Sequence, residues 1–61
     1  MSVEYIAKFR RGSGPMGQHA TDFYKDENGD IIKHFWCMYG EDREIVSSVP
    51  ESIDGYRKIE L

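Results

Sequence analysis

The fold is decided by the stretch Thr21–Tyr39, which reads TDFYKDENGDIIKHFWCMY. Two runs rich in aromatic and β-branched side chains flank the dipeptide Asn28-Gly29, and this arrangement is the strongest short signal for a β-hairpin. The second run, Ile31–Tyr39, is apolar on both of its faces. Strands of this kind are usually central in a sheet, with other groups covering each side. We therefore expect this hairpin to form the middle of a small sheet.

A two-residue turn at Asn28-Gly29 also predicts the register of the hairpin. Phe23 then faces His34, and a loop longer by two residues gives the same pairs. The short turn has one weakness, because it places two like charges, Glu27 and Asp30, opposite each other.

This register divides the apolar side chains between two faces. The larger face, which we assign to the core, holds Phe23, Ile32, Trp36, Met38 and Ile45, together with Val3, Tyr5, Ala7 and Phe9. The other face carries Tyr24, Phe35, Cys37, Tyr39 and Val46, edged by Asp22, Lys33 and Glu44. An apolar, aromatic patch rimmed by charge is typical of a protein-binding surface. Alternatively, the sheet curls into a barrel or is covered by residues 12–20, and both faces are core.

The flanking sequence supplies the remaining elements. Val3–Arg11 alternates with a period of two, which predicts a strand. A turn at Gly40–Arg43 leads to a strand at Glu44–Val49, and Tyr56–Leu61 forms a last strand. The segment Ser48-Val49-Pro50-Glu51 matches a helix capping box and predicts one helical turn near residues 49–54.

The predicted fold is therefore mainly β, in a single domain over residues 1–61 with a flexible Gly-rich loop at residues 12–17. It is a small antiparallel sheet of four or five strands, built as a twisted meander or a partly closed barrel. The composition agrees, because Ile, Val and aromatic residues dominate while the chain has only one Leu and two Ala. The alternative is an α+β fold with a short helix near residues 15–24, where apolar residues also fit a helical stripe.

Size and charge limit the functional classes. A chain of 61 residues with a net charge of -3 lacks the basic excess typical of nucleic-acid-coating proteins. The charge is uneven, because residues 1–20 carry a net +2 and the remainder carries -5. Cys37 is the only cysteine, which rules out an internal disulfide, and no apolar stretch follows Met1. We therefore expect a cytoplasmic protein without a membrane span.

The motifs that suggest catalysis or cofactors fail in context. Residues 12–17 match G-x-G-x-x-G, but the predicted hairpin at Asn28-Gly29 leaves no room for the helix that should follow this motif, and a dinucleotide-binding sheet needs a longer chain. Three soft metal ligands occur in the sequence, but His34 and Cys37 are three apart on a strand and point to opposite faces. A core this small leaves little room for a water-excluding pocket. We expect no enzyme activity, no cofactor and no metal.

The sequence thus predicts a non-enzymatic protein-binding module. It would be a stand-alone regulator or inhibitor of a larger protein, of the kind that phages and mobile elements encode. The predicted partner-binding residues are Tyr24, Lys33, Phe35, Tyr39, Glu41, Asp42 and Glu44. The alternative is a small nucleic-acid-binding β-domain that uses the first strand, through Lys8, Phe9, Arg10 and Arg11, together with exposed aromatic side chains. A homodimer through the same apolar patch is a third hypothesis.

Overall fold

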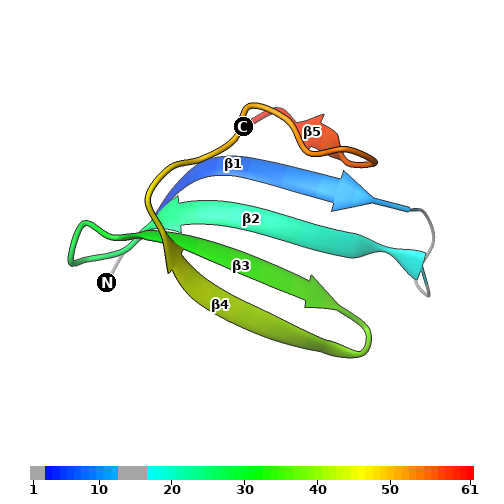
Figure 1. The fold of residues 1–61 in the computed structure, drawn as a ribbon, viewed down its shortest axis with the longest axis horizontal. Helices are drawn as coiled ribbons and strands as arrows, with labels where there is room; N and C mark the ends of the chain where they lie inside the picture. The colour runs from blue at the N-terminus through cyan, green and yellow to red at the C-terminus, as the bar shows by residue number, and fades with distance from the viewer. Residues whose placement is uncertain (1–2, 13–16) are drawn as a thin grey trace.

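The computed structural model describes residues 3–12 and 17–61. These residues form one antiparallel sheet of five strands: β1 (Glu4–Arg11), β2 (His19–Lys25), β3 (Ile31–Cys37), β4 (Gly40–Val46) and β5 (Arg57–Ile59). Across the sheet the order is β4-β3-β2-β1-β5, so β5 returns to pair with β1 (Figure 1). The predicted antiparallel fold class is confirmed, and within the described residues the sheet is not closed into a barrel.

The β2–β3 hairpin closes with a three-residue loop, Glu27–Gly29. The Asp26 amide donates to the Asp30 carbonyl at 3.0 Å, and the Gly29 amide donates to the Asp26 carbonyl at 3.1 Å. The Asp26 carboxylate accepts hydrogen bonds from the amides of Asn28 and Asp30 at 2.9 and 3.0 Å. Gly29 has a φ of 87°, the left-handed conformation that the last position of such a loop requires.

The odd number of loop residues makes the predicted register wrong by one residue. Phe23 pairs with Lys33 and not with His34. Because side chains alternate between faces, this shift turns every side chain of β3 to the opposite side of the sheet. Three residues assigned to the core are exposed instead: Trp36 to 37%, Ile45 to 68%, and Met38, which lies in the β3–β4 turn, to 50%. Ile32, also assigned to the core, stands on the same face as Trp36.

Strand β4 begins earlier than predicted. Cys37 pairs with Gly40, so the turn consists of two residues, Met38 and Tyr39, and the predicted turn at Gly40–Arg43 is wrong. The charged residues placed in that turn lie instead on an edge strand, where their side chains reach solvent.

A bulge in β1 makes the predicted core position of Tyr5 wrong. The pairing of β1 with β2 shifts between Tyr5 and Ala7, which adds one residue to β1. Ala7 and Phe9 stay on the core side with 2% and 0% exposure, whereas Tyr5 turns to the opposite face and is 40% exposed. Val3, also expected in the core, is 47% exposed.

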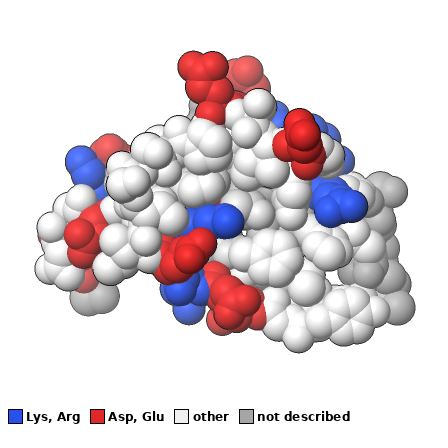
Figure 2. Space-filling model, in the orientation of Figure 1, with Lys and Arg blue, Asp and Glu red and all other residues white. Residues whose placement is uncertain are grey.

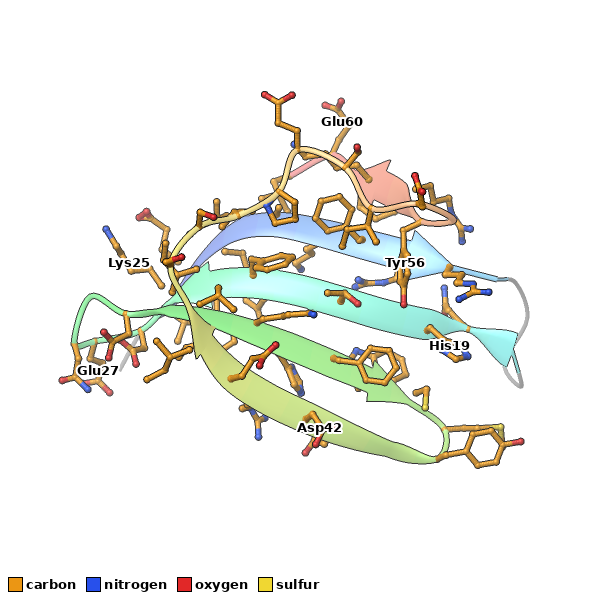
Figure 3. All side chains as sticks on the ribbon, in the orientation of Figure 1. His19, Lys25, Glu27, Asp42, Tyr56 and Glu60 are labelled. Carbon is orange, nitrogen blue, oxygen red and sulfur yellow. The ribbon has the colours of Figure 1, made fainter. Side chains whose placement is uncertain are left out.

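The core lies on one side of β1 and β2. Phe9 and Phe23 meet edge to face with ring centroids 5.9 Å apart, beside Ala7. Residues 47–56, here called the crossing segment, run from the end of β4 across the sheet to β5 (Figure 1). Its side chains Val49, Ile53 and Tyr56 pack against this cluster, and Tyr56 reaches over the sheet in Figure 3.

The predicted helical turn near residues 49–54 is wrong. These residues, all described, contain no helix, and a hydrogen bond from the Tyr56 amide to the Ile53 carbonyl (3.0 Å) closes a turn around Gly55, whose φ is 83°. The segment must cross about four strand spacings, each about 4.8 Å, and extended chain covers roughly twice the distance of helix per residue. The alternative helix near residues 15–24 is also wrong from His19 onward, where β2 begins. Residues 13–16, which hold most of the predicted flexible loop, lie outside the described residues.

Candidate protein-binding face

Strand pairing assigns each strand side chain to one of two faces. The core face holds Phe9 and Phe23 under the crossing segment. We call the opposite side the open face. Its residues are Tyr5, Lys8, Arg10, Ala20, Asp22, Tyr24, Ile32, His34, Trp36, Glu41, Arg43, Ile45, Arg57 and Ile59. Figures 1 and 3 view the sheet from the side of the crossing segment, so the open face lies behind the ribbon.

Large apolar and aromatic side chains remain exposed on the open face. Tyr5 is 40% exposed, Trp36 37% and Ile45 68%. Tyr5 and Tyr24 face each other across β1 and β2 with ring centroids 5.5 Å apart, and the Lys8 ammonium lies 4.4 Å from the centroid of the Tyr5 ring. These neighbours restrict the Tyr5 ring, so it would lose little further freedom on binding.

One ion pair on this face is largely buried. Arg10 Nη1 lies 2.6 Å from Asp22 Oδ1, with side-chain exposures of 20% and 9%. The same Arg10 nitrogen donates to the Phe9 carbonyl at 2.9 Å. Asp22 would be costly to bury alone, and the guanidinium supplies the compensating charge-assisted hydrogen bond. The pair therefore fixes Arg10 against the sheet.

A second group of charges lies across β3 and β4. His34 Nε2 is 2.8 Å from one Glu41 oxygen, and Arg43 Nη1 is 3.8 Å from the other. The hydrogen bond from His34, followed by the positive charge of Arg43, lowers the pKa of Glu41 below its ordinary value of 4.5. Glu41 therefore stays ionised at neutral pH and neutralises part of the basic charge beside it.

The open face is positive although the chain is acidic. Four basic residues, Lys8, Arg10, Arg43 and Arg57, stand against two acidic ones, Asp22 and Glu41, which gives the face a formal charge of +2. The whole chain carries -3. Figure 2 shows the side of the crossing segment, where acidic and basic side chains both occur. The acidic excess of the chain therefore lies outside the open face.

The predicted partner-binding residues do not form one surface. Tyr24 and Glu41 belong to the open face. The others on the strands lie on the core face: Lys33, Phe35, Asp42 and Glu44. Tyr39 stands at the β3–β4 turn, 86% exposed. The predicted patch combined Tyr24 with Phe35 because it assumed an even loop, and the three-residue loop separates them.

The four predicted partner-binding residues on the core face help to line a shallow cavity, to which the crossing segment contributes no residue. It has a volume of about 370 Å³ and is lined by Lys33, Phe35, Asp42, Arg43 and Glu44. Lys33 and Glu44 form an exposed ion pair at 3.7 Å, and Phe35 contacts the His19 ring with centroids 5.9 Å apart. Exposed pairs of this kind contribute little stability and remain strongly hydrated.

The residues of the nucleic-acid hypothesis also separate. Lys8 and Arg10 are on the open face. Arg11, which pairs with His19, points to the other side of the sheet. Phe9 is 0% exposed in the core, so its ring is not available to stack on a base. The aromatic side chains that share a face with Lys8 are Tyr5, Tyr24 and Trp36.

Sequence reasoning missed Tyr5, Trp36 and Ile45 as surface residues, because it placed all three in the core. The like-charge pair of Glu27 and Asp30 argued against a two-residue loop at Asn28-Gly29, but it did not distinguish a three-residue loop, which exposes Trp36 and Ile45, from a four-residue one. The bulge that turns Tyr5 has no comparable signal in the sequence.

Side chains that could bind a metal ion and helices that could cross a membrane are two further kinds of functional feature. His34 and Cys37 lie on opposite faces, as predicted, and residues 3–12 and 17–61 contain no cluster of three or more His, Cys, Asp or Glu side chains able to hold a metal ion. In the same residues, no helix has the length and apolar character needed to cross a membrane.

Comparison with protein-family models, curated proteins and solved structures finds no match for this chain.

Proposed function

We propose that the chain is a non-enzymatic protein-binding module that docks through its open face. The observation that carries this proposal is the exposure of Tyr5, Trp36 and Ile45 on the side of the sheet opposite the core. An apolar surface bordered by charge is costly to leave in water and is typical of interaction sites.

The residue types favour a protein partner. Tyrosine, tryptophan and arginine are the residues most enriched among those that dominate binding energy in protein interfaces. Tyr5 is held by Tyr24 and Lys8, and Arg10 is held by Asp22. Side chains that are already ordered lose less entropy when a partner covers them, which favours binding.

The charge of the face indicates the chemistry of the partner. With a formal +2 on the open face, the complementary surface is apolar at its centre and carries Asp or Glu at its rim. We propose that the partner is a larger cytoplasmic protein whose activity is regulated or inhibited when this module covers that surface.

Photocrosslinking from single positions tests the proposal. A benzophenone amino acid is placed at Ile45 on the open face or at Tyr39 on the turn, both strongly exposed at 68% and 86%. In extracts of the source cell, we expect a discrete protein adduct from position 45 and none from position 39. The substitution Ile45→Asp should abolish co-purification of the same protein, while Tyr39→Ser should preserve it. Equal capture by both variants would contradict docking through the open face.

A second candidate function, single-stranded nucleic-acid binding, is favoured by one observation. The basic residues of the open face share it with Tyr5, Tyr24 and Trp36, and aromatic side chains on an open sheet can stack on bases. Gel shifts at low salt distinguish this candidate. Binding that weakens steeply with salt and with Lys8→Ala, but not with Arg11→Ala on the other face, would support it over the protein-binding proposal.

A further inference from the structure

The two edges of the sheet differ in how they are protected. Edge strands invite pairing with other chains, and charged side chains are a common means of preventing it. β4 carries four consecutive charged residues, Glu41–Glu44. At the other edge, residues 57–61 read Arg-Lys-Ile-Glu-Leu, in which charged and apolar side chains alternate from Lys58 onward.

The β5 edge is also exposed and apolar. Leu61 is 69% exposed, Ile6 in the neighbouring bulge 40%, and Ile59 36%. Together with Lys58 and Glu60 they line a cavity of about 330 Å³. Within the described residues β5 pairs with β1 alone, so the backbone groups on its other side have no strand partner.

The sequence of this edge is complementary to itself. Consider two copies of an edge strand that pair about a two-fold axis perpendicular to the sheet. Residues opposite each other in the two strands must point to the same side of the sheet. The axis therefore passes between two copies of one residue, which lie directly opposite each other. With Ile59 at the axis, Lys58 of each copy faces Glu60 of the other, and the central pair is apolar. Centring on Lys58 or on Glu60 instead places like charges directly opposite each other.

We propose that this chain forms a two-fold dimer in which residues 57–61 of two copies pair as antiparallel strands, with Ile59 at the axis. Two Lys58–Glu60 pairs then lie on the side of the core face, and the two Ile59 side chains meet on the side of the open face. The five-stranded sheets join into one continuous sheet. Both open faces point the same way, so the dimer presents them side by side.

The interface is small, and the dimer is therefore concentration-dependent. Pairing over residues 57–61 buries much less than the roughly 1,600 Å² of a standard stable interface, which is typical of weak, transient association. The proposal is independent of what the open face binds, since it uses the edge of the sheet.

Charge exchange at Lys58 and Glu60 tests the dimer and its register. Sedimentation equilibrium from about 5 µM to about 1 mM should show wild-type association increasing with concentration. K58E or E60K alone places like charges opposite each other and should lower the association constant roughly tenfold. The double variant K58E/E60K should restore it. An equimolar mixture of K58E and E60K should form the heterodimer, because opposite charges then face each other at both pairs.

Two controls separate this interface from others. Ile45→Asp changes the open face and should leave association unchanged, whereas a dimer through the open face would lose it. Circular dichroism of the charge variants should match the wild type, because both side chains are exposed. A wild-type chain that stays monomeric at every concentration overturns the proposal. So does equal association of all the charge variants, or a double variant and a mixture that fail to recover.

Discussion

At Glu41, two neighbours on the open face hold an exposed carboxylate in its charged form. The hydrogen bond with His34 is the larger influence and the charge of Arg43 the second, and together they lower the pKa of Glu41. Folding therefore favours the ionised carboxylate. The resulting stabilisation is complete above pH 4.5, the ordinary value for this group, and is lost as the pH falls through the lower pKa of the folded state.

We predict that Glu41→Gln makes the protein less sensitive to acid. Urea denaturation at about pH 6 and about pH 3 should show a smaller loss in the free energy of unfolding for the variant than for the wild type, because it has no carboxylate to protonate. His34→Asn removes the larger influence and should act in the same direction. A variant that loses as much stability as the wild type would show that this carboxylate does not contribute to acid sensitivity.

At the same scale, the sequence identified basic residues but not their partners. Lys8 and Arg10 were recognised as candidates from local composition alone. The contact of Arg10 with Asp22 joins residues twelve apart in the sequence, and it depends on the pairing of β1 with β2. A long-range ion pair of this kind cannot be found before the register is known.

At the scale of elements, strands were easier to predict than the connections that set their register. The hairpin was correctly located at Asn28-Gly29, because two apolar runs flank it. Loops of two, three or four residues all accommodate a glycine at this position. They differ by a single residue in register, and alternation then decides which side chains face the core.

Alanine substitutions at two glycines with similar backbone conformations test the connections between strands. Gly12 and Gly29 have φ values of 81° and 87°. A Cβ at Gly29 would meet nothing within 4 Å, so Gly29→Ala should cost only backbone strain, about 1 kcal/mol. A Cβ at Gly12 would collide with the Gly17 carbonyl oxygen, so Gly12→Ala should cost more, roughly 2 kcal/mol or above. Urea denaturation of the two variants gives the comparison. Equal losses would indicate that Gly12 and Gly17 are not close in solution.

At the scale of the whole molecule, the crossing segment decides which side of the sheet is the core. It packs Val49, Ile53 and Tyr56 against β1 and β2. The central strands carry apolar side chains on both faces, so pattern alone offers two possible cores. Only one of these faces is reached by residues 47–56 on their way to β5.

Substitution of one isoleucine on each side tests this assignment. Ile53→Ala removes a contact with the buried cluster and should cost about 1–3 kcal/mol, less than at a fully buried site because Ile53 is only partly buried. Ile45→Ala on the open face should cost about 0.5 kcal/mol or less, because this side chain is 68% exposed. Thermal or urea unfolding measures both. A larger loss for Ile45 would show that the open face is covered in the folded protein.

The sequence by itself determined the fold class and the approximate positions of most strands. Its β-branched and aromatic residues fit a pleated sheet, and this preference is local, so it can be recognised without knowing any contact. The tertiary structure decided which face is core and which is open. That choice depends on the number of residues in the Glu27–Gly29 loop, the bulge beside Tyr5 and the path of residues 47–56. Each sets a pairing or a contact between distant residues, and a difference of one residue reverses the faces.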